Sequence, residues 1–545
     1  MSDYLMIQPF AVQLRRILKE YETTGSIFGI HKSLFYTPKA DAPFAVPDMY
    51  GKYLATPIGP SAGPHTQMSQ NIVAAWLCGG RFIELKTVQI LDELEIPRPC
   101  IDMEDEGYNV EWSQELKLEE SAHEYVVAWA LVHILPRVLG WDTVETLHAT
   151  SLHPGVIFDM SVGYNLEGIQ SPRVRRFMDT IEDASEELAK IRAILRHDFP
   201  QFADIEIPNQ IANSITLSTM HGCPPDEIER ICEYLLTERK LHTIVKMNPT
   251  LLGKEQVIDI LHNALGFREI YIPDSVFEHD ISYDKAVGLI GRLQKVAAQE
   301  GLAFGVKLSN TLAMHNHKQL MPGDEMYMSG RALYPITMNL FNKLAHEFNG
   351  DLRVSYSAGA DALNIATIAS CGPVPITACS DLLKPGGYAR FGQWLANLEA
   401  AMAAAGAGNL AEFSANKLAN LDAAAAESLV NPRYKKEYWR YGLPKVKSGL
   451  GLWDCIVAPC MEQCAVCQDV PEYNWWIKEG DPDKALEVIL ARNPLPGVTG
   501  YVCNHLCQTR CVRNDYDETV AIRALKRYAE ENGTVAPLAP KAKVG

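Results

Sequence analysis

The chain has 545 residues, 47% of them apolar, which is enough for two or three domains with substantial hydrophobic cores. No apolar run approaches the length of a membrane-spanning helix, which argues against an integral membrane protein. The formal net charge of −17, without a basic patch, argues against nucleic acid as a partner, because its phosphates would be repelled.

The cysteine pattern indicates a reducing compartment. The charged start Met1-Ser-Asp-Tyr follows no apolar signal segment, and six of the 13 cysteines are scattered singly along the chain. A secreted, disulfide-bonded protein would carry a signal segment and closely grouped cysteine pairs. We therefore expect a cytoplasmic protein with reduced thiols.

Residues 1–50 are expected to be an N-terminal extension with a helix over 10–21. From 51 to 405 the chain repeats a short apolar strand followed by a longer amphipathic segment, which is typical of a parallel α/β sheet or barrel. The candidate strands are 53–57, 82–87, 156–163, 215–220, 243–247, 269–273, 303–308, 353–357 and 375–379.

A (β/α)8 barrel needs eight strands, so at least one of these nine segments is an insertion or is misinterpreted. The barrel is favoured because polar and glycine residues follow the strands, as at 84–87 and 357–359, where barrel enzymes place their active sites. A doubly wound open sheet is the alternative, but no Gly-x-Gly-x-x-Gly turn follows the first strand.

An alanine-rich stretch at 398–407 closes this region, and residues 406–545 are expected to form a helical domain with helices over 410–421, 483–491 and 519–531. Seven cysteines cluster inside it. They are the candidate metal ligands Cys455, Cys460, Cys464, Cys467, Cys503, Cys507 and Cys511.

This cysteine density favours an iron–sulfur site. Cys503, Cys507 and Cys511 are spaced i, i+4 and i+8, so their thiolates would lie on one face of a helical turn. Zinc is the main alternative, but zinc sites usually bring paired Cys-x2-Cys knuckles, and here only Cys464 and Cys467 have that spacing.

A second chemical candidate is Cys223 in His221-Gly-Cys-Pro-Pro-Asp226. The two prolines and Asp226 predict a loop that enters a helix, which would place Cys223 at the positive end of the helix dipole. His221 is the alternative acid, because its unperturbed titration lies near neutrality. A buried structural cysteine is equally consistent with the pattern.

The segments 460–467, 493–497 and 503–511 resemble the iron–sulfur domain shared by glutamate synthase small subunits and dihydropyrimidine dehydrogenase. The resemblance implies two 4Fe-4S clusters, one held by Cys455, Cys460 and Cys511 and the other by Cys464, Cys503 and Cys507. Eight ligands would be needed, and Cys467 has no family counterpart. The eighth ligand stays open, since Lys526 and Arg527 stand near the place where dihydropyrimidine dehydrogenase offers a glutamine.

The segments 55–63, 82–87, 161–165 and 328–335 resemble the flavin-binding barrel of dihydroorotate and dihydropyrimidine dehydrogenases. The resemblance implies a TIM barrel of the dihydroorotate dehydrogenase type with bound FMN, Lys86 at the flavin, phosphate near 357–359 and 378–380, and Cys223 as proton donor. Lys246 and Lys307 both fit the second flavin lysine. The candidate cofactor-binding residues are Ala62, Gly63, Lys86, Thr87, Asn165, Lys246, Lys307, Asn310, Ser329, Gly330, Ala358, Gly359, Cys379 and Ser380.

As a whole, the chain resembles a family named for a selenate reductase subunit, which is also linked to purine metabolism and whose members often continue into a flavin and pyridine-nucleotide module. The resemblance implies an oxidoreductase that takes electrons from a separate NAD(P)H-oxidising partner, passes them through 4Fe-4S clusters to FMN, and reduces a purine or pyrimidine-like heterocycle. A non-catalytic electron-transfer subunit without flavin is the alternative. A zinc-stabilised aldolase-like barrel is a third.

Overall fold

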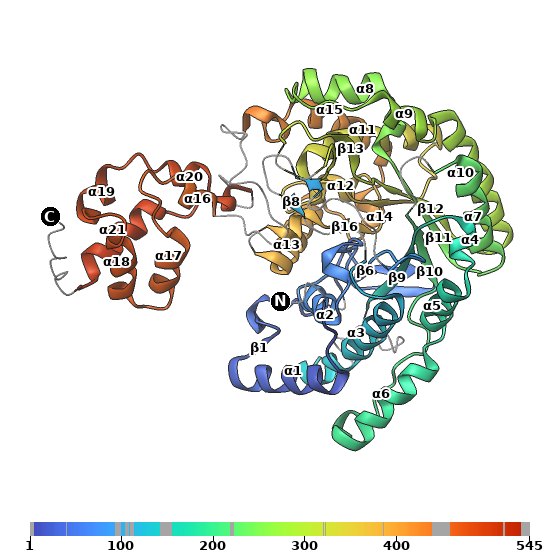
Figure 1. Ribbon diagram of the computed structural model, residues 1–545, viewed down its shortest axis with the longest axis horizontal. Coiled ribbons are helices and arrows are strands. Elements are labelled where there is room, and N and C mark those ends of the chain that lie inside the picture. The colour runs from blue at the N-terminus through green and yellow to red at the C-terminus, as the bar shows by residue number, and fades with distance from the viewer. Residues whose placement is uncertain are drawn as a thin grey trace. The chain divides into compact units, whose positions relative to one another are not determined.

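The computed structural model describes residues 5–39, 41–92, 100–103, 108–109, 114–141, 155–218, 223–319, 321, 323–384, 386–438, 458–515 and 518–535. The chain forms two compact units, Met1–Arg440 and Tyr441–Gly545, each taken by itself below (Figure 1). Among the described helices, none has the length and apolarity needed to span a membrane.

The first unit is a parallel barrel surrounded by helices, which confirms the expected fold class (Figure 1). Its strands are almost fully buried on both faces, as in parallel sheets that helices cover. In their order around the sheet, the strands are β5 Ile58–Pro60, β16 Ile376–Ala378, β15 Val354–Tyr356, β12 Phe304–Leu308, β11 His242–Met247, β10 Ser214–Leu217, β9 Ile157–Val162 and β6 Phe82–Glu84.

A close approach of backbones closes the barrel between β5 and β6. The Arg81 N–H donates to the Ile58 carbonyl oxygen at 2.8 Å. A Cβ at Gly59 would lie 1.8 Å from the Phe82 carbonyl oxygen, so only glycine fits there. The sequence at this seam is therefore set by barrel closure.

Two predicted strands need correction. Residues 269–273 form a loop, although Ile270 and Ile272 are buried as in a strand, because the segment joins no sheet. The first candidate, 53–57, overlaps β4 (Lys52–Leu54), which pairs with β3 (Val46–Met49) in an antiparallel hairpin. The first barrel strand, β5, follows directly after it.

The helices of the first unit begin with α1, at the position expected for the N-terminal helix. They are α1 Phe10–Thr24, α2 Ser69–Leu77, α3 Leu118–Leu139, α4 Leu166–Ile169, α5 Pro172–Glu182, α6 Ser185–Asp198, α7 Pro225–Thr237, α8 Lys254–Asp259, α9 Asp274–His279, α10 Tyr283–Gln299, α11 Tyr334–Glu347, α12 Ile365–Ser370, α13 Arg390–Ala405, α14 Leu410–Phe413 and α15 Lys417–Val430.

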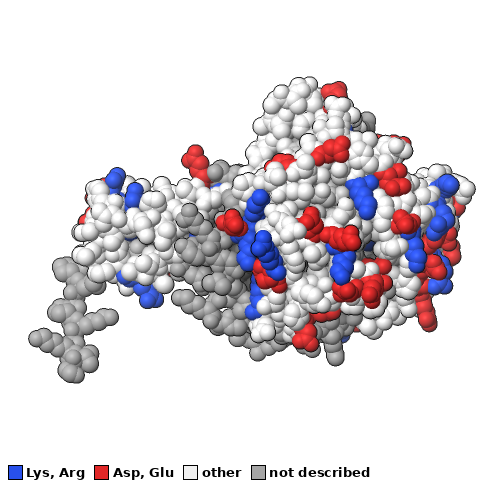
Figure 2. All heavy atoms as spheres, turned by 90° about the horizontal axis from the view of Figure 1, so that it is seen from above, with Lys and Arg blue, Asp and Glu red and all other residues white. Residues whose placement is uncertain are grey.

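The surface of this unit carries charges of both signs. On the face shown in Figure 2, Lys and Arg side chains lie beside Asp and Glu side chains. Ion pairs between neighbouring helices include Arg292 of α10 with Glu229 of α7, at 2.5 Å. Such exposed pairs contribute little to stability, typically about 0.2–1 kcal/mol each.

The first compact unit extends beyond the boundary expected near 405. Helix α13 does end at Ala405, with Gly406 in the left-handed conformation. Helix α15 then packs along α11, and the Asn420 side-chain amide donates to the Ser370 carbonyl oxygen at 2.7 Å. The unit divides from the second after Arg440, because these later helices cover the barrel.

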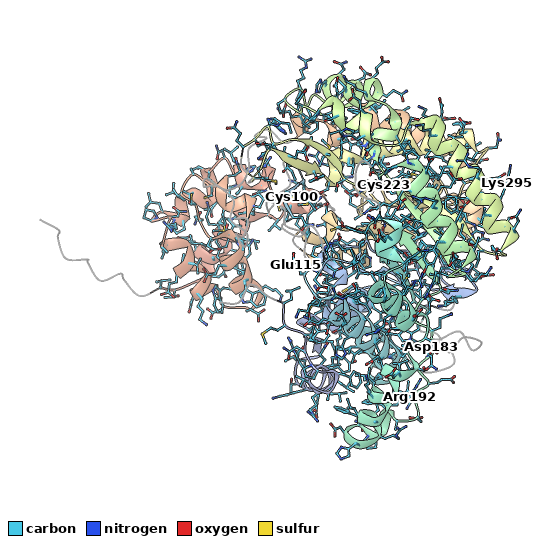
Figure 3. All side chains as sticks on the ribbon, turned by 45° about the vertical axis from the view of Figure 1, so that its right-hand side comes forward. Cys100, Glu115, Asp183, Arg192, Cys223 and Lys295 are labelled. Atoms are coloured by element: carbon cyan, nitrogen blue, oxygen red, sulfur yellow. The ribbon has the colours of Figure 1, made fainter. Side chains whose placement is uncertain are left out.

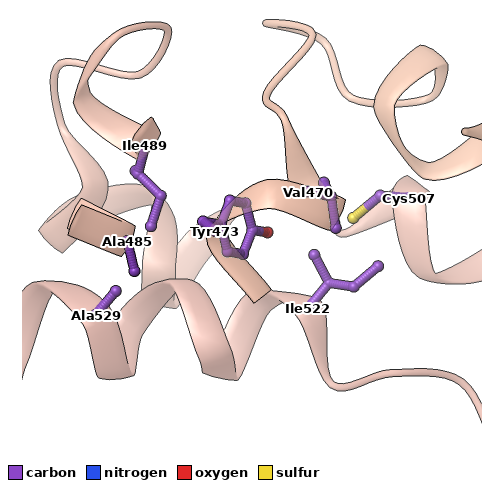
Figure 4. Close-up of a cluster of buried hydrophobic side chains, with 7 residues drawn as sticks. All are labelled: Val470, Tyr473, Ala485, Ile489, Cys507, Ile522 and Ala529. Atoms are coloured by element: carbon purple, nitrogen blue, oxygen red, sulfur yellow. The ribbon is translucent and has the colours of Figure 1, made fainter. Parts of the chain in front are cut away.

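The regular elements of the second unit are helical over its described residues. The α-helices of this unit are α16 Pro459–Glu462, α17 Val470–Lys478, α18 Pro482–Leu490, α19 Pro496–Val502, α20 Leu506–Thr509 and α21 Ile522–Asn532. Cys503, Cys507 and Cys511 do not share one helix as expected, because α20 covers only Leu506–Thr509 and His505 before it is left-handed. Helices α18 and α21 correspond to the helices expected over 483–491 and 519–531. The core shown in Figure 4 consists of Val470, Tyr473, Ala485, Ile489, Cys507, Ile522 and Ala529.

A second sheet of the first unit contributes to the site. It has the order β13 (Leu312–His315), β14 (Glu325–Met328), β7 (Ile101–Asp102) and β8 (Tyr108–Asn109). The hairpin β13–β14 is inserted between barrel strand β12 and helix α11.

Candidate functional site

A cavity of about 450 Å³ lies at the carboxyl ends of the barrel strands. Its walls include residues that directly follow β5, β6, β12, β15 and β16, together with residues of β7, β8, β13 and β14. This is the end of a (β/α)8 barrel where active sites are found. The second sheet therefore adds a wall that the barrel alone does not provide.

Most of the predicted cofactor-binding residues line this cavity. They are Ala62, Gly63, Lys86, Thr87, Lys246, Asn310, Ser329, Gly330, Ala358, Gly359, Cys379 and Ser380. The structure brings these residues together from strand ends that are far apart in sequence. Asn165 and Lys307 lie outside the lining.

Lys307 and Asn165 both have internal partners. The Lys307 ammonium pairs with the Glu84 carboxylate in the barrel interior and donates to Thr377 Oγ1 at 2.9 Å. Asn165 caps α4 by accepting the Gly168 N–H at 2.9 Å. These contacts assign both side chains to the fold of the barrel.

Lys246, at the end of β11, does not have internal partners of the kind that Lys307 has among the described residues. Its side chain lines the cavity and has no hydrogen-bond or ion-pair partner within the part of the chain that the structure describes. Burial lowers the pKa of Lys246 to about 8, because the charged form is desolvated. An ammonium in this position is available to an anionic group that enters the cavity.

The loop after β15 presents backbone donors to the same cavity. Ala358 and Gly359 have φ values of 89° and 67°, and their N–H groups have no partner among the described residues. Successive N–H groups in left-handed conformations can form a concave anion site. A Cβ at Gly359 would lie 2.7 Å from the Gly330 carbonyl oxygen, so glycine is required where the two loops meet.

The segment that follows α15 contacts the loop after β15 and stabilises it. The Asp361 carboxylate pairs with the Arg433 guanidinium and accepts the Leu363 N–H at 2.8 Å. Tyr434 stacks on Tyr334 with ring centroids 4.7 Å apart. Nothing in the sequence pattern pointed to this ion pair, because its partners lie 72 residues apart.

Of the two predicted catalytic residues, Cys223 is described and His221 lies outside the described residues. Cys223 precedes α7, as expected, and is partly buried (Figure 3). Burial raises the pKa of its thiol to about 11, with a contribution from Glu227. Cys223 does not line the cavity, whereas Ser218, the last described residue before it, does.

Several residues that the sequence did not single out line the cavity as well. They are mainly polar and include Gln89, Asn109, Asp280, Glu325, Tyr327, Arg331 and Lys384. Asp280 accepts the Thr250 hydroxyl at 2.6 Å, and burial raises the pKa of Tyr327 to about 12. Many of these residues lie in the inserted sheet or in long loops, where no strand-end pattern marks them.

In the second unit, six of the seven clustered cysteines are described, and Cys455 lies outside the described residues. Burial raises the pKa of Cys460 to about 11, and the Cys511 and Cys507 thiols contribute to this rise. Burial also raises the pKa of Cys507, with contributions from the Cys464 and Cys503 thiols. Because the Cys507 thiol also raises the pKa of Cys460, these shifts do not separate the two ligand groups that the resemblance implies, and the apportionment stays a prediction. Cys467 is exposed.

The donor set fits iron–sulfur chemistry. Burial raises the pKa of the Tyr473 phenol, and the nearby thiols of Cys507, Cys464, Cys460 and Cys503 raise it further. Thiolates are the preferred ligands of 4Fe-4S clusters. Within the described residues, no three Cys, His, Asp or Glu side chains already converge on one metal position.

Comparisons with known proteins give the same division of the chain. Residues 28–436 match the family described as oxidoreductase YgfK, N-terminal TIM-barrel domain. Residues 452–536 match the family described as dihydropyrimidine dehydrogenase domain II, 4Fe-4S cluster. The chain belongs to the YgfK oxidoreductase family. The resemblance is thereby confirmed at the level of an oxidoreductase with a TIM barrel and a 4Fe-4S domain.

The individual relatives agree with this family. YgfK of Escherichia coli K12 is 44% identical over 553 residues, which cover 98% of this chain and 52% of that protein. The chain thus spans about half the length of this relative. NADPH-Fe(3+) oxidoreductase subunit beta of Geobacter sulfurreducens is 40% identical over 92 residues, 16% of this chain and 14% of that protein.

A solved structure of ligand-free DHODH from Eimeria tenella aligns with a TM-score of 0.43 and 14% identity. The alignment covers 74% of this chain and 97% of that chain.

Proposed function

We propose that the cavity binds FMN and that this YgfK-family protein reduces a small planar heterocycle of the purine or pyrimidine kind. Electrons reach the flavin through two 4Fe-4S clusters from a partner that oxidises NAD(P)H. The observation that carries this proposal concerns Lys246, Ala358 and Gly359. Within the part of the chain that the structure describes, the Lys246 ammonium has no partner, and it lines the same cavity as the Ala358 and Gly359 N–H groups, which have none there either.

The loops after β15 and β16 suit a phosphate group. A phosphate dianion is held best by backbone N–H donors and by hydroxyl groups in a fixed arrangement. Ala358 and Gly359 offer the backbone donors, and the Ser329 and Ser380 hydroxyls lie 3.0 Å apart beside them on the cavity wall. The Asp361–Arg433 ion pair keeps the first of these loops in place.

Lys246 and Lys86 suit the isoalloxazine ring. FMN, when bound, supplies a centre that accepts electrons and delivers hydride to the substrate. A cation beside the ring stabilises the negative charge of the reduced form. Lys246 serves this role because its ammonium forms no hydrogen bond or ion pair with another described residue, and Lys86 lines the same cavity.

The remaining lining suits a neutral heterocycle. Asp280 and Glu325 present carboxylates that accept ring N–H groups and repel a carboxylate substrate. Cys223 keeps its proton at neutral pH, since its pKa is about 11, and it is our candidate for delivering that proton to the ring. His221 is the alternative donor.

The cysteine-rich unit supports electron entry from a pyridine-nucleotide enzyme. Two further relatives each match 15% of this chain: NADP(+)-dependent formate dehydrogenase subunit beta of Moorella thermoacetica, at 39% identity over 84 residues, and glutamate synthase [NADPH] small chain of Bacillus subtilis, at 33% over 86 residues. Their names describe those proteins. We propose by analogy that the donor to this chain also oxidises NAD(P)H.

Cofactor analysis of the anaerobically purified chain tests the proposal. We expect one FMN, released by acid, and about eight iron and eight sulfide per chain, as two cubane clusters require. Lys246→Met should weaken FMN binding by about tenfold or more, the scale of a charge-assisted hydrogen bond. Lys295→Met is the matched control, because Lys295 lies at the periphery on α10 (Figure 3). Stoichiometric zinc without sulfide, or a colourless protein that does not bind FMN, would refute the proposal.

A further inference from the structure

Helix α21 is fixed against the segment that carries Cys503 and Cys507. The Thr519 hydroxyl donates to the Gln508 carbonyl oxygen at 2.9 Å, and the Arg523 N–H donates to Gln508 Oε1 at 3.2 Å. The Arg523 guanidinium donates to the Cys503 carbonyl oxygen at 3.0 Å. The helix therefore has a set position relative to this cysteine group.

One turn along α21, a lysine is directed at the sulfur of Cys503. Lys526 Nζ lies 3.4 Å from Cys503 Sγ, and the lysine is only 5% exposed. A buried ammonium is costly unless it is paired and hydrogen-bonded. Among the described residues, the partner of this ammonium is the Cys503 sulfur, which carries negative charge when it is a thiolate.

We propose that Lys526 is a positioning residue that raises the reduction potential of the cluster held by Cys503. The inference rests on the proposed role of Cys503 as a cluster ligand. Reduction of a 4Fe-4S cluster adds one electron and one negative charge, and no bond to Lys526 forms or breaks. A charge-assisted N–H···S hydrogen bond stabilises the more negative, reduced form, and hydrogen bonds to sulfur are known determinants of cluster potential.

Lys526 and the next residue, Arg527, carry the same charge, but their side chains have different partners. Arg527 follows in the sequence, but its side chain is exposed, pairs with Glu531 at 3.4 Å and lies over the Tyr501 ring at 5.0 Å. Replacing either residue by methionine removes one positive charge from the same turn of α21. Only the replacement of Lys526 removes a donor to a cysteine sulfur.

The test is a redox titration of the full-length chain, prepared anaerobically and followed by electron paramagnetic resonance and visible absorbance. We expect Lys526→Met to lower the midpoint potential of one cluster by about 59 mV, a tenfold change in a one-electron equilibrium, with iron and sulfide content unchanged. Lys526→Arg should keep most of the wild-type potential. Arg527→Met should leave both potentials in place.

Each other outcome is decisive. Full clusters with an unchanged potential in Lys526→Met overturn the inference while leaving the proposed function intact. Loss of iron in both the Met and Arg variants overturns it as well, because it would make Lys526 a ligand. If only the Met variant loses its cluster, Lys526→Gln, which keeps an N–H donor without charge, must show the lowered potential. A wild-type chain without iron and sulfide overturns both proposals.

Discussion

Lys307 and Glu84 form an ion pair inside the barrel, and each side chain is 1% exposed. The pair bridges β12 and β6, across the interior, and Thr377 of β16 completes the coordination of the ammonium. Because the Lys307 ammonium is paired with Glu84 and donates to Thr377 there, this lysine is not available to a ligand. Of the two lysines that fit the second flavin position, Lys246 is the one that lines the cavity.

The Lys307–Glu84 pair should be structural. We expect Glu84→Gln to destabilise the barrel by about 3–5 kcal/mol, because it leaves a buried ammonium without its counter-charge. Chemical denaturation of the full chain measures this. The double variant Glu84→Leu with Lys307→Met should recover most of the loss. A single variant as stable as the wild type would contradict the assignment.

FMN affinity should depend on pH through Lys246. Burial lowers the pKa of Lys246 to about 8, so its ammonium is present below pH 8 and is lost as the pH rises through that value. We expect the affinity to fall by about tenfold between pH 7 and pH 9, as a single site with this pKa requires. Fluorescence quenching of FMN measures it. In Lys246→Met the FMN affinity should be lower and should not change between pH 7 and pH 9. If the affinity of this variant still falls with pH, another group causes the dependence.

Loss of the loop anchor should loosen the cofactor without affecting the clusters. Arg433→Met removes the partner of the buried Asp361 carboxylate, so the loop that carries Ala358 and Gly359 loses its support. We expect FMN to dissociate at least about tenfold faster, since breaking a buried ion pair costs several kcal/mol. Lys436→Met is the control, because its pair with Glu269 is partly exposed. Equal dissociation rates for the two variants would exclude the anchoring role.

Cys223 should matter for turnover and little for cofactor content. Cys223→Ser should slow reduction of the heterocycle by about 10²-fold or more, the scale of general acid catalysis. Dye-reduced protein and a panel of purines and pyrimidines provide the assay. A core cysteine would behave differently: its replacement lowers thermal stability and leaves the rate per folded enzyme unchanged. Equal or greater loss from His221→Ala, with Cys223→Ser near normal, would move the acid role to the histidine.

Much of the barrel was predictable because its strands are short, apolar and buried on both faces. The pattern failed at 269–273, where Ile270 and Ile272 are buried in a loop, since burial alone does not distinguish a strand from a packed loop. It also displaced the first strand, because only three residues separate β4 (Lys52–Leu54) from β5 (Ile58–Pro60).

The cavity was predictable where it is built from strand ends. Lys246 and Lys307 have the same local pattern, but Lys307 pairs with Glu84, which lies 223 residues earlier, whereas Lys246 lines the cavity. Such long-range pairing leaves no local signal. The same holds for Glu325 and Tyr327, which reach the cavity through an inserted hairpin.

The position of Cys507 couples cluster chemistry to folding. This candidate ligand is also a member of the hydrophobic core of the second unit, where it packs with Val470 and Ile522 (Figure 4). Metal binding in small domains contributes directly to folding free energy. Oxidative loss of iron would therefore free a side chain of the core as well as remove an electron carrier. On exposure to oxygen, the protease sensitivity of this unit should increase at the same time as the visible absorbance of the clusters is lost.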